Sequence, residues 1–446
     1  MHPYLPNTSE DIKEMLDVIG LGSTDELFDS IPKNLKFNRE LNLPSAKSEI
    51  EVKNLLDRLA SKNQSTTDLT CFLGAGSYDH YIPSIVKHLV GRSEFYTAYT
   101  PYQPEISQGT LQSVFEYQSM MCALTDMEVS NVSMYDAATS AAEAAILSSV
   151  QTKRKRVLVS ETLNPEYKSV LKTYLKFREV EIEFVAEKDG ETDFSDLKNK
   201  LTSDIAGVII QYPNFYGIIE NVKELEEAIH ENKSLLIMSV DPISLGVLKS
   251  PGALKADIVV GEGQALGQSL NYGGPVLGFM AATMKLVRKM PGRIIGQTVD
   301  RDGKRAFVLT LQAREQHIRR AKATSNICSD QTLNSITAAI YMATLGKEGM
   351  KEVAMQSFKK AHYTYELLLK TGKFKALYNK PFFKEFAVIT EKSVDEINEK
   401  LLEKGILGGY NLKRSNDSLE NAMLIAVTEN RTIEEIHKFV ELMEEI

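Results

Sequence analysis

The sequence predicts an α/β protein with a mostly parallel sheet, an N-terminal helical arm and a smaller C-terminal α+β domain. Short apolar segments alternate with amphipathic ones up to residue 260, and a glycine-rich stretch follows. After residue 330 the pattern changes to longer helices with short strands between them. With 446 residues, 43% of them hydrophobic, the chain is long enough for more than one core. We place the arm at 1–65, the large domain at 66–329 and the C-terminal domain at 330–446.

The bulk composition excludes several classes of protein. A net charge of −8 argues against nucleic-acid binding, for which a basic surface is usual. No apolar run reaches the roughly 20 residues that cross a bilayer, and the N-terminus lacks the pattern of a signal peptide. The cysteines form no CxxC pair, and the histidines have no partners at metal-ligand spacing. We expect a cytoplasmic protein with no metal site and no membrane or nucleic-acid contacts.

The first sixty residues predict short helices without a large core of their own. Ser23 with Glu26, and Ser48 with Glu51, have the spacing of a capping box, in which each side chain binds the other residue's backbone N–H. Prolines interrupt the region, so long helices are not expected there.

Residues 71–109 combine tyrosines with prolines and predict an irregular loop. Tyr99 and Tyr102 flank Pro101, and Pro104 follows closely, so regular helix is not expected in this segment. A tyrosine suits a contact that is apolar on one side and polar on the other. The segment either contacts a ligand or partner, or packs only within this chain.

A helix of small residues is predicted within 133–150. Its middle is almost entirely Ala, Ser and Thr, which favours close packing against neighbours. Thr139 and Ser140 lie near its N-terminus, where free N–H groups and the helix dipole attract phosphate. The composition fits a helix packed in a core equally well.

Strands and helices alternate through the middle of the chain. The sequence predicts strands at 157–159, 181–186, 207–210, 235–240 and 258–260, and helices at 166–177, 194–201 and 222–230. Such alternation implies crossover connections and a parallel sheet. Ligands on such sheets lie beyond the carboxyl ends of the strands. The loop that begins with Asp241 is therefore a candidate ligand-binding segment.

The glycine-rich stretch 257–281 predicts two buried strands joined by a loop. Gly261, Gly263 and Gly267 nearly form a dinucleotide-binding fingerprint, but the third glycine is one position late and no clear helix follows, so a nicotinamide or flavin site is not expected. Glycines allow a backbone to approach a ligand closely, although an ordinary connection has the same composition. No lysine occurs between Gly261 and Gly274.

The rest of the chain is less specific. Residues 291–326 carry six arginines, which either bind an anion or, for most of them, lie on a solvated surface. The C-terminal domain is predicted to contain helices at 333–345, 351–370, 394–403 and 433–444 and strands at 386–390 and 423–427.

Several long motifs, taken together and in this order, resemble one known family. They are LGAGSYDHYIPS, YTAYTPYQPEISQGTLQ, QYPNFYG, DPISLGVL, DIVVGEGQALG, MPGRIIGQTVDRDG, REQHIRRAKATSNIC and LGKEGM. The family is glycine dehydrogenase (decarboxylating), an oxidoreductase that forms the P-protein of the glycine cleavage system. The motifs are most similar to the α-subunits (subunit 1) of P-proteins divided into two chains. The resemblance extends to about Gly349 and, more weakly, to ENAMLIAVTE.

This resemblance implies the fold type I architecture of pyridoxal-phosphate (PLP) enzymes. It also implies a reaction in which PLP, acting as an electron sink, supports decarboxylation of glycine and transfer of the aminomethyl group to the lipoyl arm of H-protein. In this architecture an Asp, here Asp241, pairs with the pyridine nitrogen, and a lysine on a later loop forms the Schiff base. That lysine should fall within 261–267, where GEGQALG contains none and Gln264 cannot form an imine.

The resemblance therefore implies a chain with a vestigial pocket and no PLP bound to it. Thr139, Ser140, Asp241 and Gln264 mark that pocket. PLP and its lysine are expected on a homologous β-subunit within an α2β2 heterotetramer, and this chain is not expected to be active alone. Glycine and lipoylated H-protein are the other expected partners.

Two other interpretations remain open. In addition, one hypothesis extends the interpretation that this chain complements a β-subunit. The chain either acts only as a scaffold for the β-subunit, or is a self-sufficient PLP enzyme that uses Lys255 or Lys285. Fold type I sites form near subunit boundaries, so we hypothesise that Tyr99, Tyr102 and Glu105 reach into the partner's active site. The tyrosines would donate hydrogen bonds and Glu105 would accept a proton.

Overall fold

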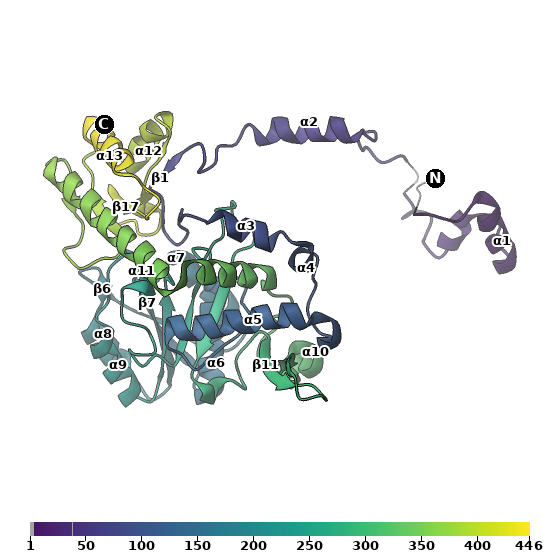
Figure 1. Cartoon of the computed structure of the whole chain (residues 1–446), viewed down its shortest axis with the longest axis horizontal. Coiled ribbons are helices and arrows are strands. Elements are labelled where there is room, and N and C mark those ends of the chain that lie inside the picture. The colour runs from purple at the N-terminus through teal and green to yellow at the C-terminus, as the bar shows by residue number, and fades with distance from the viewer. Residues whose placement is uncertain (1–3, 38) are drawn as a thin grey trace. The chain divides into compact units, whose positions relative to one another are not determined.

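The computed structural model describes residues 4–37 and 39–446. The chain divides into two compact units, Met1–Asn63 and Gln64–Ile446, both drawn in Figure 1. Residues 1–3 and 38, which fall in the predicted arm, lie outside the described residues. The division of the second unit into a large and a C-terminal domain stays a prediction.

The first unit consists of short helices, as predicted, but the capping box expected for Ser23 and Glu26 does not form, because Glu26 Oε1 accepts from the Gly22 N–H and the Ser23 hydroxyl. Helix α1 covers Ser9–Ile19, a 3-10 turn covers Thr24–Phe28 and α2 covers Glu49–Ala60. Ser48 and Glu51 form the predicted capping box, with the Ser48 N–H donating to Glu51 Oε2 over 2.8 Å. Among the described residues up to position 63, none is buried.

The second unit is built on a mostly parallel sheet in the order β2-β10-β9-β8-β7-β3-β4. Strands β4, β3, β7, β8 and β9 pair in parallel, and β10 is antiparallel to both β9 and β2. The bounds are β2 Val129–Ser130, β3 Arg156–Ser160, β4 Glu181–Val185, β7 Ile205–Tyr212, β8 Leu235–Val240, β9 Ile258–Glu262 and β10 Gly278–Ala282. The predicted parallel sheet, and the two strands around the glycine-rich loop, are confirmed.

Helices cover both faces of this sheet because alternate strand residues point to opposite sides. Met238 and Val259 belong to a core that includes residues of five helices: α3 (Ser84–Val90), α5 (Pro104–Thr125), α8 (Phe194–Lys200), α9 (Val222–Glu231) and α11 (Thr332–Lys370). Ile237 and Ile258 belong to the opposite core, under α6 (Ala137–Thr152) and α7 (Pro165–Leu175). Alanines line the buried side of α6, and their small side chains let this helix lie close to the strands. Figure 1 shows the helices around the sheet.

The C-terminal part adds a second, antiparallel sheet in the order β13-β14-β17-β16. Its strands are β13 Lys375–Ala376, β14 Glu385–Ile389, β16 Tyr410–Asn411 and β17 Ala422–Ala426, with helices α12 Val394–Glu403 and α13 Ile433–Glu445. Phe386, Ile425 and Phe439 lie in its apolar core. Helix α11 joins this part to the large sheet and is interrupted at Gly346, whose φ of 60° is not helical. The two helices predicted here are therefore two halves of one kinked element.

The remaining elements are short. They are β1 Thr70–Cys71, α3 Ser84–Val90, α4 Ser93–Tyr96, β5 Glu187–Lys188, β6 Glu191–Thr192, β11 Ile294–Val299, β12 Arg305–Thr310, α10 Gln316–Arg319 and β15 Ile406–Leu407. No helix of the described chain is both long and apolar enough to cross a membrane.

The prediction of an irregular loop throughout 71–109 is wrong in part. Tyr96 ends α4, and α5 begins at Pro104, so Glu105 lies in the first turn of a helix. Proline fits this position because the first N–H of a helix has no intrahelical acceptor. The stretches 72–83 and 97–103, the second of which contains Tyr99 and Tyr102, are irregular.

Candidate functional site

The candidate site lies where β8 and β9 end and α6 begins, the edge at which parallel α/β sheets bind ligands. Asp241 follows β8, Glu262 ends β9 and Gln264 lies in the turn after it. With Tyr78 and Tyr167 they border a cavity of about 30 Å³. That volume holds about one water molecule, whereas pockets for small organic ligands usually measure roughly 300 Å³ or more.

Asp241 is paired with a lysine from the C-terminal part of the chain. The Nζ atom of Lys384 lies 2.7 Å from Asp241 Oδ2, 2.9 Å from His80 Nε2 and 3.6 Å from the centroid of the Tyr78 ring. The Lys384 side chain is 2% exposed. The second Asp241 oxygen accepts a hydrogen bond of 3.0 Å from the Ile243 N–H. Both the cation and the backbone donor that this carboxylate needs come from its own chain.

A wider polar network holds Lys384 in place. An ammonium group only donates, so His80 accepts at Nε2 and donates from Nδ1 to Glu429 over 2.6 Å. The Tyr78 hydroxyl donates to Glu385 over 2.5 Å, and burial raises the pKa of Glu385 to about 7. The network therefore joins the loop before α3 to β14 and to the segment after β17.

Gln264 lies within the segment predicted to carry a Schiff-base lysine, and its side-chain amide is fully hydrogen-bonded. Its Oε1 accepts from the Tyr78 N–H over 3.0 Å, and its Nε2 donates to the carbonyls of Tyr78 and Gln268 over 3.1 and 2.7 Å. The residue is 2% exposed. Its side chain therefore fastens the loop around Tyr78 to the turn after β9.

The N-terminus of α6 is occupied by carboxylates of this chain. Asp136 is the N-cap and accepts from the Thr139 N–H over 2.7 Å, and the Ser140 hydroxyl donates to the Asp136 carbonyl over 2.6 Å. Glu262 accepts from the Ala137 N–H over 3.2 Å. Thr139 and Ser140 thus lie at the predicted helix start, with their hydroxyls directed to the cap residue.

Two glycines of the glycine-rich loop serve packing within the chain. A Cβ on Gly261 would lie 2.3 Å from the Val240 carbonyl oxygen, and one on Gly263 would lie 2.8 Å from the Leu277 side chain. Such distances exclude any larger residue without movement of the strands. At these positions, therefore, the loop has the ordinary structural use that the sequence left open.

The tyrosine segment lies apart from this cavity. Tyr99 is 80% exposed, and Tyr102 is 43% exposed. The Tyr102 hydroxyl accepts a hydrogen bond of 2.7 Å from Nη2 of Arg293, whose guanidinium lies 5.1 Å above the Tyr102 ring. Arg293 is 4% exposed and is also 3.2 Å from Asp330, so this arginine does not belong to a solvated surface. Glu105 is exposed on α5.

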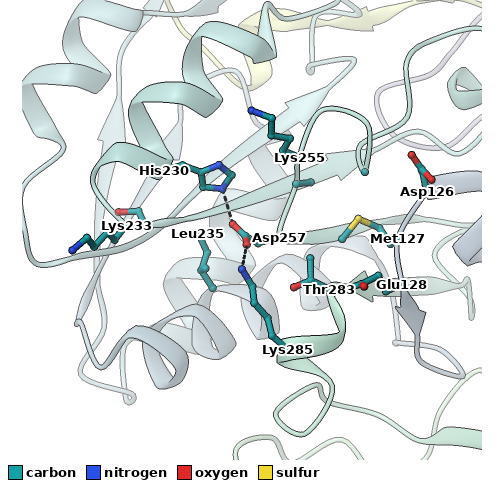
Figure 2. Close-up of a pocket in the computed structure, with 13 residues that line it drawn as sticks. Asp126, Met127, Glu128, His230, Lys233, Leu235, Lys255, Asp257, Thr283 and Lys285 are labelled. Atoms are coloured by element: carbon teal, nitrogen blue, oxygen red, sulfur yellow. Dashed lines mark hydrogen bonds and ion pairs between the residues drawn. The ribbon is translucent and has the colours of Figure 1, made fainter.

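Lys255 and Lys285 lie at the opposite end of the strands, around a groove of about 590 Å³. Figure 2 shows Lys285 beside Asp257, which precedes β9 and also contacts His230. Lys285 Nζ is 3.0 Å from Asp257, and Lys255 Nζ is 3.2 Å from Glu226. Because Asp241 and Gln264 follow the carboxyl ends of β8 and β9, neither lysine is placed near them.

Comparison with known proteins places the chain in a family. A family model described as the glycine cleavage system P-protein matches residues 2–443. The chain belongs to this family. It is 54% identical to "Probable glycine dehydrogenase (decarboxylating) subunit 1" of Listeria monocytogenes serotype 4b (strain F2365) and 53% identical to the protein of that name in Carboxydothermus hydrogenoformans, with 99% of each chain covered. The resemblance drawn from the motifs is confirmed.

Solved structures agree with this assignment. A crystal structure of a P-protein of the glycine cleavage system, in inhibitor-bound form, has a TM-score of 0.91 and 41% identity, with 99% of both chains covered. Glutamate decarboxylase of Lactobacillus brevis has a TM-score of 0.69 at 11% identity, which shows the fold alone. The predicted PLP-transferase-like (fold type I) architecture is confirmed.

The residues of this P-protein chain do not fit PLP at the candidate site. The Asp expected for a pyridine nitrogen is already bound to Lys384, and the helix start expected for the phosphate is bound to Glu262. The turn after β9 contains Gln264 and no lysine, and the remaining cavity is about 30 Å³. No reaction step is therefore assigned to PLP in this chain.

Sequence reasoning missed the side chains that fill the site. It placed Asp241 and Gln264 there, but neither Lys384 nor His80. One signal was present, because Lys384 and Glu385 interrupt the run PFFKEFAVI. Charged residues inside a strand-like apolar run are either buried and paired or misassigned.

We expect the raised pKa of Glu262 to appear in the pH dependence of the free energy of unfolding. Burial raises the pKa of Glu262 to about 8, whereas an unfolded glutamate titrates near 4.3. The folded state therefore keeps a proton that the unfolded state has lost, and the free energy of unfolding falls as pH rises between these values, by up to about 1.4 kcal/mol per pH unit. Urea denaturation at pH 6, 7 and 8 should show a shallower slope in Glu262→Gln. The exposed control Glu227→Gln should keep the wild-type slope, and equal slopes in all three proteins would contradict the assignment.

Proposed function

We propose that this chain is the PLP-lacking subunit of a two-chain glycine dehydrogenase (decarboxylating) and completes a β-subunit that carries PLP and its lysine. The observation that carries the proposal is the pairing of Asp241 with Lys384 beside a loop that has Gln264 in place of a lysine. The assembled enzyme would decarboxylate glycine and pass the aminomethyl group to the lipoyl arm of H-protein. An α2β2 assembly in the cytoplasm is the arrangement we propose.

The surface of the first unit supports a role in assembly. Helix α1 carries Ile12, Met15, Val18 and Ile19, all more than a third exposed, and they border a largely apolar groove of about 680 Å³. Side chains of this kind are rarely left in water over so long a segment. We infer that they contribute to an apolar interface of the kind found in obligate complexes. The two partners together should bury well over about 2,000 Å² of accessible surface in it. On this account the isolated chain self-associates or is poorly soluble.

The tyrosine segment supports a contribution to the partner's site. The Tyr99 hydroxyl donates to no other described residue of this chain, and the Tyr102 hydroxyl only accepts from Arg293, which leaves its hydrogen free to be donated. Glu105 lies next to them at the exposed start of α5. We propose that this group completes the partner's active site.

Reconstitution tests the proposed function. The chain and its β-subunit, purified separately, should show no glycine–bicarbonate exchange above background when assayed singly with PLP and H-protein. Mixing them should restore exchange by at least about a hundredfold, because activity needs both chains. Exchange by the isolated chain would support the self-sufficient enzyme. Full exchange by the β-subunit alone would leave this chain at most the role of a scaffold.

A further inference from the structure

In enzymes that use PLP, an acidic side chain pairs with the cationic ring nitrogen of the cofactor. In this chain the partner of Asp241 is instead the Lys384 ammonium at 2.7 Å. The three hydrogens of that ammonium face Asp241, His80 and the Tyr78 ring, so all are used. A cation of a ligand would have to displace a buried lysine that has no alternative partner in this network.

A helix N-terminus is the usual place for a ligand's phosphate in α/β folds. Here the carboxyl group of Glu262 occupies the start of α6. Its carboxylate accepts from the N–H groups of Ala137, Gln264 and Leu277 over 3.2, 3.0 and 3.1 Å. A phosphate at this position would meet a carboxyl group where it needs free N–H donors, because those donors are already bonded to Glu262.

Glu262 and Asp241, the partner of Lys384, border one remaining space. Tyr78 borders it too, with its ring centroid 3.6 Å from Lys384 Nζ, its backbone N–H bonded to Gln264 and its hydroxyl bonded to Glu385. The cavity that is left, about 30 Å³, is bordered by Glu262, Asp241 and Gln264. The polar groups at Asp241 and at the start of α6 are therefore satisfied from within the chain.

We propose that Lys384 and Glu262 are built-in substitutes for the ring cation and the phosphate of PLP, and that together they close the site. This inference rests on the proposed function and deepens it: the missing lysine is only one of three barriers to PLP. Restoring a lysine at position 264 does not by itself create a PLP site. Removing the two substitutes restores affinity for PLP even without that lysine.

The consequence for the assembly is structural. His80, which accepts from Lys384, is itself bonded to Glu429. Next to His80 in the sequence, Asp79 accepts a hydrogen bond of 2.9 Å from Arg431. The network thus joins the loop before α3, the end of β8 and the C-terminal sheet without any ligand. We infer that the closed site holds these three parts of the chain in one arrangement, whether or not the β-subunit has PLP bound.

Three variants, each purified in complex with the β-subunit, test the proposal. They are Gln264→Lys, the double variant Lys384→Ala/Glu262→Ser and the triple variant that combines them. After incubation with PLP and borohydride reduction, peptide mapping measures the pyridoxyl group at residue 264. We expect the triple variant to carry at least tenfold more label at this residue than Gln264→Lys alone. In the double variant, but not in wild type, PLP should raise the melting temperature of this chain. Hydrogen exchange of peptides from this chain measures the change.

Each outcome is decisive. Stoichiometric label in Gln264→Lys alone overturns the proposal, and so does a folded double or triple variant that gains no affinity for PLP. If the double variant assembles only when PLP is present, the proposal is supported, because PLP then compensates the unpaired Asp241. A wild-type chain that is itself labelled contradicts the proposed function, whereas label in Gln264→Lys with an unlabelled wild type contradicts only this inference.

Discussion

Replacing Lys384 by Met should destabilise the chain by about 3–5 kcal/mol. The methionine keeps most of the volume but removes the cation, and leaves the mostly buried Asp241 carboxylate with only the Ile243 N–H as a donor. Breaking one side of a buried ion pair has this size of effect because the remaining charge stays desolvated. Urea denaturation followed by far-UV circular dichroism measures the loss.

The double variant Asp241→Asn/Lys384→Met is the matched control. Asparagine keeps an oxygen for the Ile243 N–H but carries no charge, so the double variant should recover at least half of the lost stability. An exposed lysine, such as Lys223→Met on α9, should change the free energy of unfolding by less than about 0.5 kcal/mol. If Lys384→Met is as stable as wild type, the ion pair does not hold the site.

Replacing Tyr99 by Phe should lower glycine–bicarbonate exchange of the assembled enzyme by about tenfold or more. The change removes a hydroxyl and almost no volume, and tenfold corresponds to about 1.4 kcal/mol of transition-state stabilisation. Tyr99 is 80% exposed, so its hydroxyl contributes nothing to the fold of the chain itself. A loss of activity without loss of assembly therefore places the hydroxyl in the partner's site.

Tyr102→Phe should lower exchange to a similar degree but has a second effect. Its hydroxyl is the acceptor for buried Arg293, so the variant also removes a hydrogen-bond partner from a charged group. Its melting temperature should fall, whereas that of Tyr99→Phe should not. Tyr96→Phe, which changes a 69% exposed tyrosine on α4, is the matched control and should keep full activity. Full exchange in both Tyr99→Phe and Tyr102→Phe would favour the scaffold interpretation.

The architecture could be predicted because it depends on local patterns. Parallel strands end at one edge, so Asp241 and Gln264 were placed there from strand positions alone. The break at Gly346 agrees with the two helices predicted at 333–345 and 351–370. The helix that begins at Pro104 was not predicted, because dense prolines argue against regular helix, although a single proline fits the first helical position.

The filling of the site could not be predicted in the same way. Lys384 reaches Asp241 only because the C-terminal sheet packs against the end of β8, a tertiary contact with no periodic signal in the sequence. For Glu262 the difficulty is different, since its neighbours Gly261 and Gly263 suggest a loop open to ligands, although both glycines serve internal packing. Local patterns therefore located the pocket, whereas only long-range contacts show that it is closed.

The central claim is that the partner, and not this chain, carries the PLP lysine. Borohydride reduction of the active complex, followed by peptide mapping of both chains, tests it most directly. We expect one pyridoxyl group per β-subunit and none on this chain. A pyridoxyl group on Lys384, Lys255 or Lys285 in amounts that match the activity would contradict the account.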